Sequence, residues 1–186
     1  DAKLHLKCAV IDGQTVITGA SNWTKYAFEK NVEDTIVLSS MPLAETYSGL
    51  FDRLALQFVP FGSFEETPNR DVDFPDIENG SSGKAWIQVP SARSFTLRGR
   101  SVSFFTPGRE GLRAFIEQAR SATNEILIAK YLISDAEVVN AISEIASNKQ
   151  CNVRLITDHV SLGGHYPKFL QQLWDAGVDV EYMSGE

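Results

Sequence analysis

The stretch that decides the fold is LHLKCAVIDGQTVITGASNWT, residues 4–24. Its first eight residues alternate as in a half-buried β-strand. The dipeptide Asp12-Gly13 predicts a tight turn, and the apolar run 15–18 predicts a second strand that returns along the first. The hairpin brings residues 19–22 beside His5 and Lys7, so we expect an imidazole, an ammonium and an amide in one anion-binding pocket. One side of the first strand carries Leu4, Leu6, Cys8 and Val10, and the other carries His5, Lys7, Ala9 and Ile11.

The composition and charge of the chain are those of a soluble globular protein. A length of 186 residues suffices for one sizeable domain with its own core. The net charge of -7 argues against a protein that coats nucleic acid through its overall charge, although a local basic cleft stays open. Cys8 and Cys151 lack any paired spacing and are interpreted as core residues. The sequence contains no apolar run of about 18 residues, so no transmembrane helix is predicted.

Helices and strands alternate along two blocks of the chain. Residues 4–58 predict strand, turn, strand, loop, strand and helix, and residues 101–186 predict strands that alternate with helices. Residues 60–100 keep neither period, and their prolines, acids and Gly-Ser cluster indicate a linker or a surface excursion. The whole pattern predicts an α/β fold with a mostly parallel sheet flanked by helices on both faces.

The opening stretch carries a family resemblance. His5, Lys7 and Asp12 fit the pattern H-x-K-x4-D, and Gly19 to Asn22 follow at a fixed interval. This pattern resembles the HKD motif of the phospholipase D superfamily, whose members cleave phosphodiesters in lipids and nucleic acids. The continuation NWTKYAFEKNVEDTIVL is similar to the segment after that motif, particularly in the nuclease-like and mitochondrial phospholipase D-like branch. The second block, with FFTP, YLISD and VRLITD, resembles the segment that normally precedes an HKD motif.

The two halves of this resemblance stand in an unexpected order, because in the family the half with FTP comes first. We therefore expect residues 1–59 to be the motif-bearing C-terminal half of an HKD domain, 60–100 a linker and 101–186 the N-terminal half of an HKD domain. Two accounts fit this order. The chain is either a circularly permuted or cut single domain, or the middle of a two-repeat enzyme, which a linker of this length favours.

The resemblance implies a metal-independent phosphodiesterase that needs no cofactor. His5 would attack phosphorus and form a phosphohistidine, while Lys7 and Asn22 would hold the phosphate oxygens with help from Ser21. A second histidine would protonate the leaving oxygen. In the family that histidine comes from a second HKD motif, so we expect a homodimer or a second HKD repeat within one polypeptide.

Other residues are assigned supporting roles or are left outside the site. Asp12 belongs to the catalytic set by the resemblance, with closure of the turn before Gly13 as its structural alternative. Gly19 and Glu33 would support the site, and Glu33 would do so by orienting a histidine. Ala20 stands where the family usually has serine, so one hydroxyl contact to phosphate is lost. The remaining histidines, which lack H-x-K spacing and are interpreted as parts of a surface loop, are His159 and His165.

The sequence leaves the substrate open between nucleic acid and phospholipid. A local basic rim for nucleic acid would consist of Lys3, Lys7, Lys25 and Lys30. An apolar rim for lipid would consist of Phe61, Phe64 and Phe74, and membrane association is not otherwise indicated. Two alternatives to a hydrolase stay open. One is a non-catalytic HKD-like scaffold or dimerisation module, which Ala20 and the missing second motif favour. The other is a phosphatidyltransferase of the phospholipid-synthase type, which would use His5 but pass the group to an alcohol.

Overall fold

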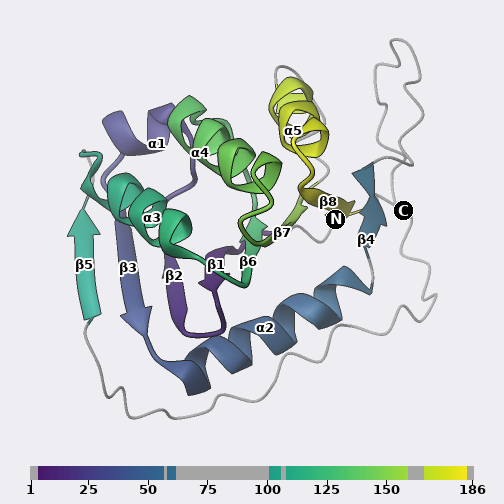
Figure 1. Cartoon of the computed structure of the whole chain (residues 1–186). Coiled ribbons are helices and arrows are strands. Elements are labelled where there is room, and N and C mark those ends of the chain that lie inside the picture. The colour runs from purple at the N-terminus through teal and green to yellow at the C-terminus, as the bar shows by residue number, and fades with distance from the viewer. Residues whose placement is uncertain (1–3, 57, 62–100, 106–107, 159–165, 184–186) are drawn as a thin grey trace, which may run out of the picture.

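A computed structural model describes residues 4–56, 58–61, 101–105, 108–158 and 166–183 of the chain. Its strands form one eight-stranded sheet in the order β4-β8-β7-β6-β1-β2-β3-β5 (Figure 1). The strands are β1 (Lys7–Ile11), β2 (Thr15–Gly19), β3 (Asp34–Ser39), β4 (Phe58–Pro60), β5 (Ser101–Phe105), β6 (Glu125–Lys130), β7 (Asn152–Thr157) and β8 (Asp179–Met183). The helices are α1 (Lys25–Glu29), α2 (Met41–Ala55), α3 (Glu110–Ser121), α4 (Ala136–Ser147) and α5 (Tyr166–Asp175). The predicted α/β class is confirmed.

The sheet is mixed, and the expectation of a mostly parallel sheet is wrong. Only the neighbouring pairs β6–β7 and β7–β8 are parallel, and every other pairing among the described strands is antiparallel. The short turn at 12–14 between β1 and β2 allows only an antiparallel pair, because a parallel pair needs a crossover of a dozen or more residues. Helical crossovers through α4 and α5 produce the parallel part.

Both sequence blocks contribute to this single sheet. The first block supplies β1 to β4, and the second supplies β5 to β8. They meet where β1 pairs with β6, where β3 pairs with β5 and where β4 pairs with β8. Most of the predicted linker, residues 62–100, lies outside the described residues, as do Phe64, Phe74, His159 and His165. The boundaries at 59 and 101, and the choice between a permuted domain and a slice of a two-repeat enzyme, stay predictions.

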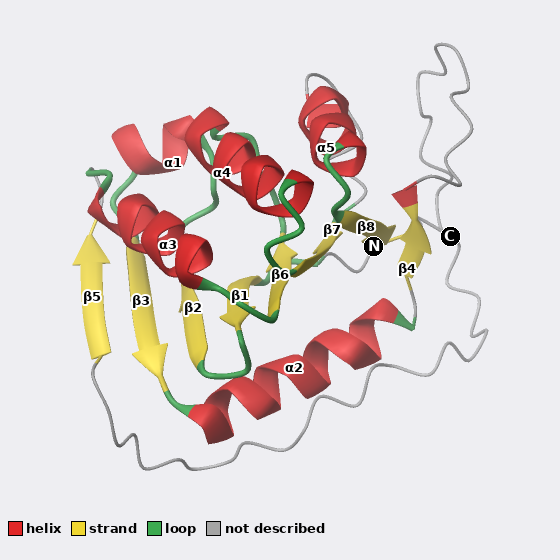
Figure 2. Ribbon diagram, viewed as in Figure 1, coloured by secondary structure: helices red, strands yellow, loops and turns green. Residues whose placement is uncertain are grey.

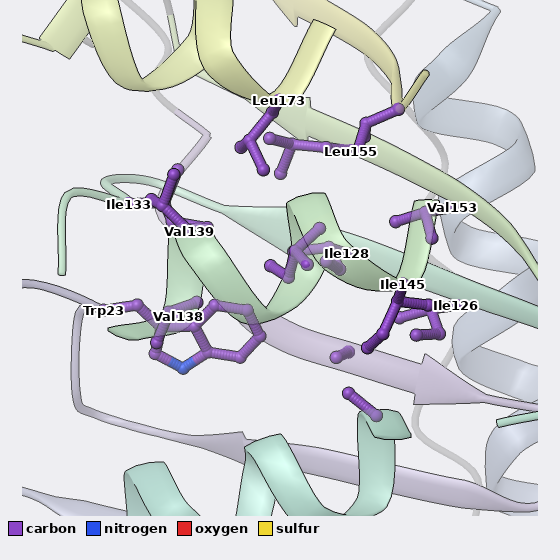
Figure 3. Packing of buried hydrophobic residues seen from close by; sticks show 14 of the residues in the cluster. Trp23, Ile126, Ile128, Ile133, Val138, Val139, Ile145, Val153, Leu155 and Leu173 are labelled. Carbon is purple, nitrogen blue, oxygen red and sulfur yellow. The ribbon is translucent and has the colours of Figure 1, made fainter. Parts of the chain in front are cut away.

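Helices cover both faces of the sheet, as predicted (Figure 2). The helix α2 packs on one face, over a cluster that includes Cys8, Val10 and Val16. The other described helices pack on the opposite face, where Ala9 and Ile11 are buried. The predicted alternation is therefore confirmed for the apolar side chains of this stretch. The larger core lies on this second face and gathers around Trp23, Ile126, Ile128, Ile133, Val138, Val139, Ile145, Val153, Leu155 and Leu173 (Figure 3).

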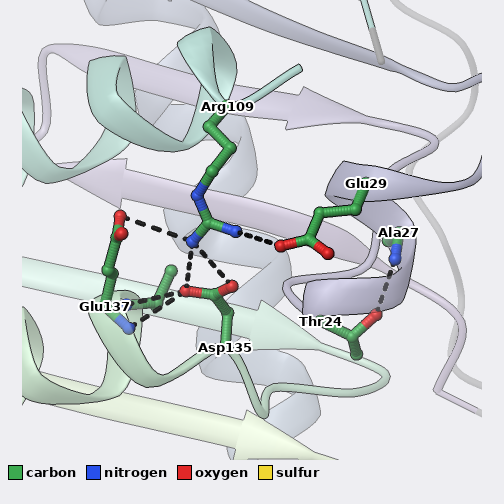
Figure 4. Close-up of polar contacts among 7 residues, drawn as sticks. Thr24, Ala27, Glu29, Arg109, Asp135 and Glu137 are labelled. Carbon is green, nitrogen blue, oxygen red and sulfur yellow. Dashed lines mark hydrogen bonds and ion pairs between the residues drawn. The ribbon is translucent and has the colours of Figure 1, made fainter. Parts of the chain in front are cut away.

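An ion-pair network fastens α1 to the second block (Figure 4). Nη2 of Arg109 donates to both carboxylate oxygens of Asp135, at 3.0 and 2.9 Å. Arg109 also contacts Glu29 of α1 at 3.4 Å and Glu137 of α4 at 3.3 Å. The Asp135 carboxylate caps α4 by accepting from the backbone N–H of Glu137 at 3.0 Å. Because Asp135 is buried and serves both the cap and the arginine, this network fixes α1 relative to α3 and α4.

Candidate active site

The candidate site lies at the end of the sheet where β6 and β7 finish. There Lys7 at the start of β1 is paired with Lys130, and Lys130 is paired with Thr157. The same end holds Gly19 at the finish of β2, paired with Thr35 near the start of β3. Ligands in open α/β sheets bind at the carboxyl ends of the parallel strands. The hairpin therefore delivers its motif to the end of the sheet where a ligand site is expected.

His5 and Lys7 lie together, with contrasting exposure. The His5 side chain is exposed, whereas Lys7 is only 8% exposed. Nζ of Lys7 donates to the backbone oxygen of His5 at 2.9 Å, which fixes the segment that carries the imidazole. The Tyr131 ring contacts both residues: its centroid is 5.0 Å from that of the His5 ring and 5.4 Å from Nζ of Lys7. Burial lowers the pKa of Lys7, and the nearby charge of Glu33 opposes that shift.

The loop 19–22 is held against the start of β3. Gly19 has φ +145°, and a Cβ there would lie 2.3 Å from the backbone oxygen of Asp34, so only glycine fits. The backbone N–H groups of Ala20 and Ser21 donate to that same oxygen at 3.1 and 3.3 Å. The Ser21 hydroxyl also donates to it, at 3.2 Å. Ser21 is 2% exposed, so in this structure its hydroxyl secures the loop.

Asn22 projects from this loop with an unsatisfied polar atom. Its side-chain oxygen is buried and has no hydrogen-bond partner among the described residues. Buried amide groups are normally paired, because desolvation without a partner is costly. A water or another donor would satisfy the Asn22 oxygen, whereas the NH2 group of the same amide is the part that can donate to a phosphate oxygen.

Glu33 contributes negative charge to this region, as does the buried Asp158, whose carboxylate accepts from the N–H of Leu4 at 2.8 Å. Oε1 of Glu33 accepts from Nδ2 of Asn31 at 2.6 Å, so the Glu33 carboxylate is oriented by a neighbour in the same loop. Its charge raises the pKa of both Lys7 and Lys130 against the effect of burial. The structure thus places Glu33 beside the two lysines, and the predicted orientation of a histidine by Glu33 stays a prediction.

The structure places Asp12 far from His5 and Lys7, at the opposite end of β1. Asp12 follows the last residue of β1, whereas His5 precedes the first, and seven residues at about 3.3 Å each separate them by roughly 20 Å. Its carboxylate accepts backbone N–H bonds from Thr123, Asn124 and Glu125 at 2.9, 2.8 and 2.9 Å. Burial raises the pKa of Asp12, but these bonds outweigh burial and the net shift is downward. This geometry is that of the structural alternative, a carboxylate that ties the β1–β2 turn to the start of β6.

Two residues at the end of β6, Lys130 and Tyr131, were not selected from the sequence as parts of the candidate site. Lys130 is 2% exposed, and its Nζ donates to the backbone oxygen of Ser21 at 2.9 Å. Tyr131 packs against His5, as described above. The signal that could have found them is the sudden appearance of a cation and a phenol at the carboxyl end of an otherwise apolar parallel strand.

Two searches of the described residues returned nothing. No group of three or more His, Cys, Asp or Glu side chains there is arranged to hold a metal ion. None of the described helices has both the length and the apolar character needed to cross a membrane.

Comparisons with known proteins place this geometry in context. The sequence model of the family described as "Cardiolipin synthase, PLD-like domain" matches residues 1–55 and 115–186. The mitochondrial cardiolipin hydrolase of Xenopus laevis is 35% identical over 69 residues, which are 36% of this chain and 33% of that protein. The protein of the same name from Chlamydomonas reinhardtii is 40% identical over 53 residues, 28% of this chain and 24% of that protein. The one from Canis lupus familiaris is 27% identical over 79 residues, 42% of this chain and 28% of that protein.

The chain thus spans about a third or less of the length of these curated relatives. No solved structure matches it.

Replacing Asp12 by asparagine tests its role. Asparagine keeps the left-handed backbone at φ +51° but cannot accept all the N–H bonds, so the free energy of unfolding should fall by about 1–3 kcal/mol. Because the folded-state pKa of Asp12 is depressed, its stabilisation is present above the ordinary value of about 3.9 and is lost as the pH falls through the folded-state pKa. Urea unfolding at neutral and acidic pH should therefore show the difference between the two proteins shrinking below about pH 4.

The control for this experiment is Asp52→Asn. Asp52 has a 66% exposed side chain, is 3.5 Å from Arg154, and should change stability by less than about 0.5 kcal/mol. Neither variant should alter the rate at which the folded protein turns over a phosphodiester. A large loss of turnover in fully folded Asp12→Asn would restore Asp12 to the catalytic set.

Proposed function

The chain belongs to the phospholipase D superfamily, in the family of PLD-like domains of the cardiolipin synthase type, and on that premise we propose that it cleaves phosphodiesters through a phosphohistidine on His5. The observation that carries the proposal is the set of groups at this end of the sheet: the exposed His5 imidazole, the buried Lys7 ammonium that holds the His5 backbone, and the Asn22 amide, whose NH2 group can donate to a phosphate oxygen. Exposure suits a nucleophile that must reach a phosphorus atom. Burial suits a cation that must stay in place.

In the first step, an imidazole nitrogen of His5 attacks phosphorus, a P–N bond forms, and the P–O bond to the leaving group breaks. Lys7 and Asn22 would hold the non-bridging oxygens, whose negative charge grows in the transition state. An acid supplies a proton to the leaving oxygen. In the second step, the conjugate base of that acid takes a proton from water, the water oxygen attacks phosphorus, the P–N bond breaks, and both His5 and the acid are regenerated.

The acid in this scheme is a second histidine. We propose that it is His5 of a second copy of the chain, or its counterpart in a second HKD motif of a longer polypeptide. The exposure of His5 leaves the imidazole accessible to such a partner. A two-fold arrangement would place two identical imidazoles on opposite sides of one phosphate.

We propose that the substrate is an anionic phospholipid at a bilayer surface. The named relatives are cardiolipin hydrolases, and two large apolar side chains are exposed in the segment that follows Asn22: Tyr26 at 69% and Val32 at 85%. Lys25 directly precedes Tyr26 in the sequence and Lys30 lies between Tyr26 and Val32; both lysines are exposed. Apolar side chains with neighbouring cations favour an anionic bilayer surface. Phe61, by contrast, is buried against Trp174 and does not form an exposed rim.

Turnover of bis(p-nitrophenyl) phosphate in EDTA tests the reaction itself. We expect wild-type turnover to survive the chelator and to fall by at least about a hundred-fold in His5→Ala, because the nucleophile is gone. Release of p-nitrophenol is the measurement, and product analysis with glycerol present separates hydrolysis from transfer to an alcohol. Absence of turnover in the wild type would favour the non-catalytic scaffold.

Mixing wild type with His5→Ala tests the second histidine. If two chains share one site, equal amounts that are mixed and allowed to exchange form about a quarter wild-type dimers, so turnover per wild-type chain falls by about half. If each chain acts alone, turnover per wild-type chain stays constant. The measurement is initial rate against mixing ratio, and a linear response would refute a site shared between two copies of His5.

The double variant Tyr26→Ser with Val32→Ser tests the substrate surface. On vesicles of phosphatidylcholine with an anionic phospholipid, we expect headgroup release to fall about ten-fold, because apolar area available to the bilayer is lost. Turnover of the soluble diester should not change. The matched control is Met41→Ser, since Met41 is 68% exposed but begins α2 at the other end of the sheet. Cleavage of single-stranded nucleic acid in place of vesicle lipid would overturn this choice of substrate.

A further inference from the structure

Lys130 is a buried cation for which the proposed chemistry gives no role. It ends β6, whose side chains on the same face include Ile126 and Ile128, both fully buried. A leucine or methionine would fill this position without the desolvation that a buried ammonium requires. The position nevertheless carries a lysine, directly opposite Lys7 across the β1–β6 pair.

The surroundings of Lys130 disfavour its charge. Burial lowers its pKa well below the ordinary value and Lys7 lowers it further, whereas Cys8 and Glu33 act in the opposite direction. The ammonium lies 4.3 Å from the centroid of the Trp23 ring, a cation–π contact that offsets part of the burial. No carboxylate among the described residues forms an ion pair with it.

Lys130 forms its hydrogen bond with the loop 19–22, which carries Asn22 at its end. Its Nζ donates to the backbone oxygen of Ser21 at 2.9 Å. On the other side of Asn22, the backbone oxygen of Trp23 accepts from the N–H groups of Ser134 and Asp135, both at 2.9 Å. The Ser21 carbonyl, which belongs to the peptide before Asn22, is thus held by the second block of the chain. The peptide after Asn22 is held as well, because the N–H of Trp23 donates to the backbone oxygen of Leu132 at 3.3 Å. With the peptides on both sides of Asn22 held, the Cα–Cβ direction of Asn22 is fixed.

We propose that Lys130 is a positioning residue for the site: by holding the Ser21 carbonyl it sets the direction in which Asn22 presents its amide to the transferred phosphoryl group. This inference rests on the proposed function of the same site. Lys130 does not contact the substrate in this account. It acts through the loop, and positioning errors of a fraction of an ångström at such a group reduce the rate of the chemical step.

The test compares Lys130→Met and Lys130→Arg with the control Lys168→Met, an exposed lysine on α5. We expect kcat for bis(p-nitrophenyl) phosphate to fall by about ten-fold or more in Lys130→Met, with a smaller change in KM, because the misplaced amide matters most in the transition state. Lys130→Arg should recover part of kcat. The melting temperature of Lys130→Met should equal or exceed that of the wild type, since an apolar side chain replaces a buried charge. Lys168→Met should leave kcat, KM and the melting temperature unchanged.

Two further measurements separate this inference from the proposed function. Isothermal titration with inorganic phosphate should show weaker binding in Lys130→Met. The 1H–15N signals of the Asn22 side-chain amide and the Trp23 indole should shift in Lys130→Met but not in Lys168→Met. If the wild type turns over no diester, the proposed function fails, and these two measurements alone decide the role of Lys130.

The outcomes that overturn the inference are specific. Wild-type kcat and KM in Lys130→Met would do so. A lowered melting temperature with unchanged kcat would assign Lys130 a purely structural role. Unchanged Asn22 and Trp23 signals would show that the loop does not depend on the ammonium.

Discussion

The antiparallel pairing of β1 with β6 is the constraint on which the rest of the structure depends. It joins the two sequence blocks at the centre of the sheet, from Lys7 opposite Lys130 to Ile11 opposite Ile126. Because side chains on paired positions point to the same face, this register places Ala9 and Ile128 in the larger core and sets two lysines beside each other at the end of the pair. A slip of one residue would exchange the faces of β1 and turn His5 and Lys7 toward α2.

This register concentrates positive charge at a buried position. Like charges on directly opposed residues destabilise a sheet, and burial removes the water that would screen them. Among the described residues, the charge of Glu33 acts on both lysines and opposes part of this effect. A second acid, Asp158, is buried at the same end of the sheet, where its carboxylate accepts from the N–H of Leu4 at 2.8 Å.

Local sequence features predicted local structure well. The alternation from Leu4 to Ile11 predicted which side chains face α2 and which face the larger core, because side-chain direction in a strand depends only on its own period. The Asp12-Gly13 turn was predicted for the same reason, and both residues have the positive φ that such a turn requires. The antiparallel hairpin of β1 and β2 was predicted correctly. The mostly parallel sheet was predicted wrongly, since the alternation of helices and strands suggested parallel neighbours, whereas β2 with β3, β3 with β5 and β1 with β6 pair antiparallel.

Interactions between distant parts of the chain could not be predicted in this way. The partner of Lys7 is on β6 and the donors to the Asp12 carboxylate lie at 123–125, and nothing near residues 5–12 in sequence indicates either contact. The motif spacing grouped Asp12 with His5 because both belong to one pattern, whereas an extended strand must place them at opposite ends. Motif spacing selected candidate residues on the hairpin, and only the sheet register could add Lys130 and Tyr131 from the second block as further candidates.

The two ends of the hairpin thus depend on the second block in different ways. At the turn, Asp12 binds backbone N–H groups that precede β6, an arrangement that stabilises the fold without approaching the site. At the open end, the backbone oxygen of Ser21 accepts from Lys130. The backbone oxygen of Trp23 accepts from the N–H groups of Ser134 and Asp135. Asp135 is also the residue that accepts from Arg109 and caps α4 (Figure 4). The loop is therefore anchored to a residue of the second block that also belongs to this polar network, and the geometry of the candidate site depends on correct packing of the two blocks. A half of the fold on its own would contain the HKD residues but not the groups that orient them.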